Sequence, residues 1–214
     1  CGKSTMLRHL VGLLKPAKGR ILYGETDFWA AAPEDRENLM QKFGVLYQSG
    51  ALWSSMTLAE NIALPMAEYT TLDELEIFAR ARMKLALVGL AGFEDFYPSE
   101  ISGGMQKRAG LARAMALDPD ILFLDEPSAG LDPISAKLLD ELILELRDNL
   151  GTTFVVVTHE LDSIFTIGDD SVFLDPVTKT MLTTGCPREL VKDSRDERVI
   201  EFLTRGRQDR LAGV

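Results

Sequence analysis

The chain has 214 residues, 46% of them hydrophobic, which is enough for one large domain with a sizeable core and a smaller subdomain. Its 23 lysines and arginines against 33 aspartates and glutamates give a formal net charge of −10, which argues against bulk binding to nucleic acid or to an anionic bilayer. No apolar run approaches the roughly 18 residues that span a membrane, so we expect any membrane role to come through a partner.

The first five residues, CGKST, read as the second half of a phosphate-binding loop. A complete P-loop is G-x-x-x-x-G-K-[ST], and Gly2, Lys3 and Ser4 match only its end. The apolar residues that follow recur at helical spacing, so the loop is expected to open a helix that ends before Lys15 and Pro16. The sequence therefore looks like a fragment that begins inside the loop.

Short strands and a helical insert are expected next. Residues 20–23 and 43–47 read as strands. Residues 57–60 and 71–74 both match the capping box T-x-x-E, which predicts that a helix begins at each. We expect these helices to build a mostly helical insert up to about Phe96.

Two motifs follow the insert. In SGGMQKR, residues 102–108, Ser102 can cap a helix running to Leu117, and the two glycines let a backbone approach a phosphate closely. The run ILFLDE then predicts a buried strand that delivers Asp125 and Glu126 to its end, where ligands of open α/β sheets bind. The alternative is an acidic strand end that caps the next helix, which explains one carboxylate but not two.

The second half of the chain continues the alternation of helices and strands. Asp132 and Pro133 signal a helix start, and Gly151 a helix end. The expected buried stripe of that helix contains Ile134, Leu138, Leu139, Leu142, Ile143 and Leu146. Residues 152–157 read as a strand buried on both faces, and the polar tail after Arg205 is expected to fray. The pattern is typical of a parallel sheet covered on both faces.

The GKST start, SGGMQKR and ILFLDE, in this order, resemble the ATP-binding cassette (ABC) ATPases over nearly the whole chain. The resemblance implies an α/β P-loop NTPase fold with a mostly parallel sheet core and a helical subdomain insert. Residues 1–50 and 115–214 would form the RecA-like core, and about 51–114 the helical subdomain with the signature motif. The N-terminal strands and the residue that stacks on adenine would lie upstream of the chain start.

The same resemblance, with the P-loop chemistry, implies that the chain binds ATP and Mg²⁺. Phosphate binding is expected from Cys1, Gly2, Lys3, Ser4 and Thr5, because the amides at this helix start donate to phosphate oxygens. Lys3 would place its charge on the terminal phosphates, and Ser4 would offer its hydroxyl to Mg²⁺. Cys1 stands at a variable position of the loop, where the ordinary interpretation is a small filler.

Four further residues carry expected roles at the nucleotide. Asp125 would hold Mg²⁺, and Glu126 would orient or deprotonate the attacking water. Gln48 matches the family's Q-loop glutamine, which touches both metal and water, although a glutamine at a strand end is by itself usually a loop residue. His159 matches the switch histidine that contacts the γ-phosphate, whereas His9 has an ordinary, partly buried role.

Ser102, Gly103 and Gly104 would serve the nucleotide of an opposite subunit, because Lys3 already occupies the γ-phosphate of its own site. The resemblance therefore implies a homodimer with two ATP molecules between the chains. Asp132, in SAGLD, would be the D-loop contact that crosses between subunits.

The signature departs from the commonest family pattern. Ile101 replaces a leucine, and Met105 stands where glutamine is usual, with Gln106 one place later. Since the Ser-Gly-Gly contacts are preserved, hydrolysis is expected to survive.

QSGALWSSMTLAENIALPM, the SGGM variant, SAGLDPI and EFLTRG together look like the Mla-type ATPases that work with MCE-domain proteins in intermembrane phospholipid transport. This implies a membrane permease that docks beside Gln48, where Ala51, Leu52, Trp53 and Met56 gather. The alternative is that this loop folds onto the insert's own core, because exposed apolar residues mark an interface only when they are contiguous.

The expected function is therefore that of a peripheral ATPase subunit on the cytoplasmic face of the inner membrane, partnered by a permease and an MCE protein, with no nucleic acid. Two cysteines fit a reducing cytoplasm. The alternatives are the ATPase of another importer or exporter, for example for amino acids or metal ions, and a soluble ABC protein of DNA repair or translation. The acidic charge argues against the last, and the intact motifs argue against a scaffold without turnover.

Overall fold

The computed structural model describes residues 2–204, so the expectations for Cys1 and for the tail after Arg205 lie outside the described residues. Thr5–Val157 forms one unit, and residues 2–4 join residues 158–204 in a second unit. Among residues 2–204, no helix combines the length and the apolar composition that a membrane crossing needs.

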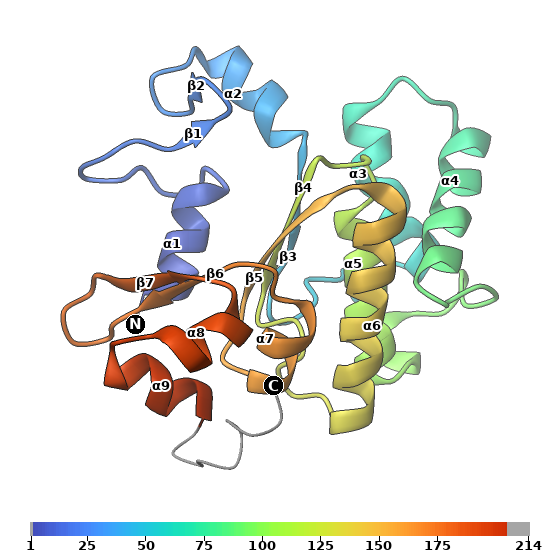
Figure 1. The fold of residues 1–214 in the computed structure, drawn as a ribbon. Helices are drawn as coiled ribbons and strands as arrows, with labels where there is room; N and C mark the ends of the chain where they lie inside the picture. Colours follow the sequence, from blue (N-terminus) through green and yellow to red (C-terminus); the bar gives the residue numbers. More distant parts are fainter. Residues whose placement is uncertain (1, 205–214) are drawn as a thin grey trace. The chain divides into compact units, whose positions relative to one another are not determined.

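A three-stranded parallel sheet lies at the centre of the larger unit (Figure 1). Its strands are β3 (Phe43–Leu46), β4 (Ile121–Asp125) and β5 (Thr153–Val157), in the order β3-β4-β5. Leu46 pairs with Leu124, and Asp125 pairs with Val157. The strands therefore end together at one edge, and the expected mostly parallel sheet core is confirmed.

Helices cover both faces of this sheet because its side chains alternate between them. On one face Phe123 packs with Leu7 and Val11, which belong to the helix α1 (Lys3–Leu10) and the turn after it. On the other face lies α5 (Gly103–Ala114), which approaches so closely that any side chain on Gly44 of β3 would collide with the main chain of Ala114. Glycine at this position therefore sets the distance between helix and sheet.

The helical insert contains α3 (Leu58–Tyr69), α4 (Glu74–Leu87) and the short 3-10 helix η1 (Pro98–Glu100). The capping box at Thr57 is confirmed, because its hydroxyl accepts from the Glu60 amide while the Glu60 carboxylate accepts from the Thr57 amide. The second expected box at residues 71–74 is wrong. Asp73 caps α4 and forms the reciprocal pair with Glu76, since its carboxylate is placed one turn before that amide.

The long helix α6 (Pro133–Leu150) begins and ends as expected, with Asp132 as N-cap and Gly151 at a left-handed φ of +66° as C-cap. Its expected apolar stripe is only partly correct. Leu139, Ile143 and Leu146 are buried and Leu142 is half-buried, but Ile134 is 74% exposed and Leu138 57% exposed. Leu138 lies about 100° around the helix from Leu139, so it points away from the buried stripe.

Three elements differ from expectation near their ends. The helix α1 stops at Leu10 because Gly12, at a φ of +81°, turns the chain against Phe28, where a side chain would clash with the aromatic ring. The expected strand at residues 20–23 shrinks to β1 (Leu22–Tyr23), which pairs antiparallel with β2 (Thr26–Asp27) ahead of α2 (Pro33–Met40). The helix capped by Ser102 ends at Ala114 rather than at Leu117.

The strand at residues 152–157 is present as β5, but it is not buried on both faces as expected. Its first residue is exposed and the other four are half-buried. Within the described residues, β5 pairs with β4 alone.

The C-terminal unit has a core of its own. It contains α7 (Leu161–Ile167), an antiparallel pair of β6 (Ser171–Leu174) and β7 (Met181–Gly185), α8 (Pro187–Asp193) and α9 (Glu197–Thr204). Leu161, Val191, Val199 and Leu203 are buried together. The buried carboxylate of Asp175 accepts a 2.6 Å ion-pair hydrogen bond from Arg198, which ties the turn after β6 to α9.

Candidate functional site

The phosphate-loop residues stand at the start of α1. Gly2 precedes the helix at a φ of +93°, in the left-handed region that favours glycine. Lys3 and Ser4 are its first two residues, followed by Thr5, and its first turn contains no acidic side chain. The amides of a helix's first turn point out of the helix, and its dipole is positive there, so this end is suited to an anion.

Three of the predicted site residues meet at one edge of the sheet. Gln48 follows the end of β3 by two residues, Asp125 is the last residue of β4, and Glu126 comes next. Because Leu46 and Leu124 pair in parallel strands, these side chains leave the same edge. Gln48 is exposed, and the two carboxylate residues are half-buried.

The backbone of Glu126 is held in an unfavourable conformation. Its φ is +49°, a region that costs a residue with a side chain about 1–2 kcal/mol. Its N–H donates to the Val157 carbonyl at 2.7 Å, and its own carbonyl accepts from the Ala129 amide at 3.1 Å. Such strained residues cluster at functional sites, where the surrounding structure fixes them.

The signature residues lie at the start of α5, against the start of α6. Ser102 is the N-cap, and its hydroxyl accepts from the Met105 amide at 3.3 Å, which confirms the expected cap. A methyl group on Gly104 would contact Ser135 at 3.4 Å, so glycine keeps the two helix starts close. Figure 1 shows α5 and α6 side by side.

Asp132 belongs to the same corner, because its carboxylate caps α6. It accepts from the amides of Ile134 and Ser135, both at 3.0 Å, and from the Ser135 hydroxyl at 2.5 Å. These hydrogen bonds, first among them the one from the Ser135 side chain, lower the pKa of Asp132. The structure therefore brings Asp132 and the Ser-Gly-Gly segment together through Ser135.

Gln106 does not replace the usual glutamine of the signature. Its side-chain amide turns back and donates to the carbonyl of Pro98 at 2.9 Å and to that of Ile101 at 3.4 Å. Met105, which stands at the usual position, is half-buried. The side chain of Gln106 thus organises the loop before Ser102.

His159 follows β5 by two residues and belongs to the C-terminal unit. It is exposed, and its Nε2 lies 3.3 Å from a carboxylate oxygen of Glu160. His9 is half-buried on α1, and its Nδ1 donates to the Leu14 carbonyl at 2.6 Å. That contact is the ordinary structural role expected for His9.

Sequence reasoning missed Asn61, which organises the loop around Trp53. Asn61 is fully buried in α3, accepts from the Trp53 amide at 2.7 Å, and donates to the carbonyls of Trp53, Met56 and Thr57 at 2.9–3.1 Å. The signal was present in the sequence, because a single amide stands within the apolar helix LAENIALPM.

Each of the two expectations for this loop, an exposed docking surface or a loop folded onto the insert, holds for part of it. Leu52 and Met56 are half-buried against the insert, whereas Ala51 is exposed and Trp53 is 54% exposed. The Trp53 main chain is thus anchored while its side chain faces solvent.

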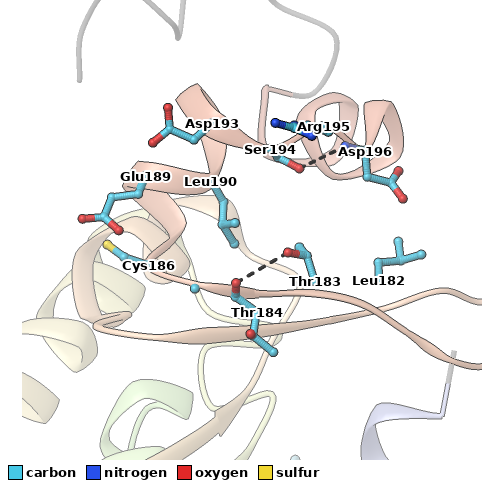
Figure 2. A pocket seen from close by; sticks show the side chains of 11 residues that line it. Leu182, Thr183, Thr184, Cys186, Glu189, Leu190, Asp193, Ser194, Arg195 and Asp196 are labelled. Atoms are coloured by element: carbon cyan, nitrogen blue, oxygen red, sulfur yellow. Dashed lines mark hydrogen bonds between the residues drawn. The ribbon is translucent and has the colours of Figure 1, made fainter.

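A cavity of about 460 Å³ lies in the C-terminal unit, between β7 and α8 (Figure 2). Its lining includes Thr183 and Thr184 of β7, Glu189 and Asp193 of α8, and Arg195. No site residue predicted from the sequence belongs to this lining, so the cavity does not contribute to the predicted nucleotide chemistry.

A helix start suited to phosphate, carboxylates at the end of a parallel strand, and a capped Ser-Gly-Gly helix start define a nucleotide-binding domain of the ABC type. The chain belongs to the ABC transporter family, which it matches over residues 1–129. The expected fold class and family are therefore confirmed.

Curated relatives include two kinds of transport protein. The probable ribonucleotide transport ATP-binding protein mkl of Mycobacterium tuberculosis is 42% identical over 207 residues, which cover 97% of this chain and 56% of mkl. The intermembrane phospholipid transport system ATP-binding protein MlaF is 38% identical in Haemophilus influenzae and 39% in Escherichia coli K12, over 94% of this chain and 75% and 74% of those proteins. The chain thus spans little more than half the length of mkl.

Solved structures of ATP-binding cassettes share the fold. The cassette MJ0796, in a dimeric post-hydrolysis state with ADP and Pi, is 28% identical and has a TM-score of 0.76, covering 86% of this chain and 80% of that one. CbiO1 of Clostridium perfringens, part of the ABC transporter complex cbiONQ, is 26% identical with a TM-score of 0.81, covering 99% of this chain and 82% of that one.

Proposed function

We propose that this chain binds and hydrolyses ATP to drive a transporter that moves phospholipids between membranes. One observation carries the chemistry, namely that Gln48, Asp125 and Glu126 leave the same edge of the parallel sheet. The lipid substrate is supported by the two MlaF relatives, which are named for intermembrane phospholipid transport.

The phosphate-binding part of the proposal assigns Gly2, Lys3, Ser4 and Thr5 to ATP, with Cys1 completing the loop. Lys3 supplies the charge at the terminal phosphates, and the α1 amides supply hydrogen bonds. We assign residues 1–50 and 115–214 to a RecA-like core and about 51–114 to a helical subdomain. The second group holds α3, α4 and all of α5, including the signature.

Mg²⁺ fits the donors that the chain offers. Ser4, Gln48 and Asp125 carry oxygen donors, the type that Mg²⁺ prefers, and Mg²⁺ is commonly bound through one or two carboxylates plus phosphates and water. Residues 2–204 contain no group of three or more His, Cys, Asp or Glu side chains arranged to hold a metal. When bound, the ion neutralises phosphate charge.

In the proposed hydrolysis, Glu126 accepts a proton from, or orients, the attacking water, and Gln48 positions that water. His159 contacts the γ-phosphate. Ser102, Gly103 and Gly104, with Asp132, complete the site of a second copy in a homodimer. This arrangement is supported by the dimeric state of the related cassette MJ0796.

The proposed partners are an integral membrane permease, which docks on the loop that exposes Trp53, and an MCE-domain protein. The ATPase would then lie peripherally on the cytoplasmic face of the inner membrane. Ribonucleotide is the competing cargo, because mkl, at 42% identity, is named for its transport.

The test is to purify the full-length protein with its membrane partner and to identify the molecule that the complex retains. Phospholipid retained by the complex and ATPase activity stimulated by phospholipid vesicles are the expected results. Retention and stimulation by ribonucleotides instead would keep the ATPase and overturn the lipid cargo. A complex without ATPase activity would overturn both.

A further inference from the structure

The segment that follows β3 has a backbone that requires support. Gly50 and Ala51 are consecutive residues in the left-handed region, at φ +77° and +53°. Glycine adopts this conformation freely, but alanine does so at a cost of about 1–2 kcal/mol. The turn has one local hydrogen bond, from the Gly50 amide to the Tyr47 carbonyl at 2.8 Å. Two further hydrogen bonds to this segment come from α5.

Lys107 of α5 contacts the main chain of this segment. Its ammonium donates a hydrogen bond to the main-chain carbonyl of Gln48, although the two residues are 59 positions apart. The residue is only 7% exposed, and burial lowers the pKa of its ammonium. Burying a charged group costs free energy unless it finds a strong partner. The Gln48 carbonyl is therefore the partner that offsets part of the cost of burying the Lys107 ammonium.

Arg113 makes the matching contact six residues further along α5. Its guanidinium donates to the carbonyl of Ala51, the residue with the unfavourable φ. Between the two basic residues lies Gly110, where a methyl group would come within 2.8 Å of the Gly50 carbonyl oxygen. Lys107, Gly110 and Arg113 follow one another at intervals of three, so they share one face of α5. This face of α5 packs against the turn at Gly50.

We propose that Lys107 and Arg113 are positioning residues that hold the turn after β3 and thereby set the places of Gln48 and Trp53. The proposal rests on the proposed function for the roles given to Gln48 and to the signature residues. Because α5 begins at the signature residues, a displacement of α5 relative to β3 would move the Gln48 and Ala51 carbonyls with it. Asn61 anchors the other end of the same segment, at Trp53.

The consequence is a mechanical connection within one chain. In the proposed homodimer the signature end of α5 contacts the nucleotide of the second copy, whereas the turn carries Gln48 and leads to the exposed Trp53. Coupling of two sites requires an element whose arrangement both sites bias. The face formed by Lys107, Gly110 and Arg113 makes α5 that element.

The experiment uses the full-length protein with Trp29→Phe, so that Trp53 is the only tryptophan of this segment of the protein. Lys107→Met and Arg113→Met each remove a donor while keeping a flexible, unbranched side chain. In each variant we expect acrylamide to quench Trp53 fluorescence more strongly, and kcat to fall about tenfold, equivalent to about 1.4 kcal/mol in the barrier. ATP affinity should stay within about twofold, because neither residue belongs to the phosphate loop. Lys107→Arg, which keeps a donor, should show the quenching and the kcat of the parent protein.

Lys84→Met is the matched control. Lys84 is 3% exposed, lies on α4 and pairs with Asp118, so its loss also removes a buried ammonium. It should lower stability while leaving Trp53 quenching and the kcat of the folded protein unchanged. If Lys107→Met does not fold, Arg113→Met carries the same test.

Two results separate this inference from the proposed function. Unchanged Trp53 quenching in folded Lys107→Met and Arg113→Met overturns the positioning role, whatever their activity. If the Lys107→Met and Arg113→Met variants show altered quenching but Gln48→Ala keeps full activity, the positioning of the loop stands and the catalytic role of Gln48 is overturned. A change in quenching that Lys84→Met reproduces equally would reduce the effect to general destabilisation and reject the proposal.

Discussion

The main-chain N–H of Glu126 donates a 2.7 Å hydrogen bond to the carbonyl oxygen of Val157, the last residue of β5. This bond continues the β4–β5 pairing one residue beyond Asp125, at a φ of +49°. The conformation turns the chain out of the strand directly after the two carboxylates. The main chain at Glu126 is therefore held by its hydrogen bond to the sheet.

Glu126→Gln should retain ATP binding but lower ATP turnover in the full-length protein by at least about a hundredfold, as loss of a catalytic base commonly does. Because substrate then persists, the variant should accumulate as a dimer with bound ATP. Turnover is measured by phosphate release and assembly by size-exclusion chromatography with light scattering. Near-normal hydrolysis would remove Glu126 from the mechanism.

The strained backbone gives a separate prediction for stability. Glu126→Gly and Glu126→Ala both remove the carboxylate, but only glycine accepts a φ of +49° without strain. The glycine variant should therefore be more stable than the alanine variant by about 1 kcal/mol in urea unfolding, while both lose turnover. Equal stability of the two variants would mean that the main chain at this position relaxes.

The prediction for the signature residues uses two variants together. Ser102→Arg places bulk and positive charge where a partner's γ-phosphate must fit, so each chain should bind ATP through Lys3 yet fail to dimerise and hydrolyse. Lys3→Ala should lose ATP affinity itself in an equilibrium titration. Mixing the two variants leaves one composite site intact, and partial hydrolysis should return only on mixing. Demonstrated heterodimers without recovery would contradict the arrangement across two chains.

Tyr23 provides a pH-dependent prediction. Burial raises its pKa from 10.0 to about 12, and its hydroxyl donates to the Leu10 carbonyl at 2.5 Å. Above pH 10 the unfolded chain loses this proton while the folded chain keeps it, so the free energy of unfolding should fall as pH rises from 10 toward 12. Difference absorbance at 295 nm between the wild type and Tyr23→Phe measures the titration. A midpoint near 10 would place Tyr23 in solvent.

Sequence reasoning succeeded where a motif is tied to the end of an element. Gly2 before a helix, Asp125 at the end of a strand and Ser102 as a cap all follow from local chemistry, and the structure places them so. Local chemistry also misled at Thr71, because Asp73 offers a stronger cap two residues later. A pattern of hydrophobic spacing likewise cannot tell that Leu138 faces away from the core.

Contacts between distant segments could not be predicted in this way. The hydrogen bond from Lys107 to Gln48 depends on the packing of α5 under β3, which in turn depends on the absence of a side chain at Gly44. The partial burial of β5 could not be predicted either, since its own residues read as a fully buried strand.

The final prediction concerns the proposed permease contact. Trp53 is 54% exposed, while its main chain is held by Asn61 through hydrogen bonds that a change of side chain does not remove. Trp53→Asp should therefore keep the loop and the ATPase activity of the isolated protein, but abolish copurification with the membrane subunit. A desolvated, unpaired charge at an interface typically costs several kcal/mol, which is enough to dissociate a complex of ordinary affinity.

Trp53→Phe is the control, because it keeps an aromatic ring and should retain most of the captured permease. The assay is a pull-down from detergent-solubilised membranes, with lipid analysis of the captured complex. Undiminished capture by Trp53→Asp would place the contact elsewhere on the chain. A loss of capture accompanied by weakened ATPase activity in the isolated protein would instead show that the loop itself had rearranged, since Gln48 lies only five residues before Trp53.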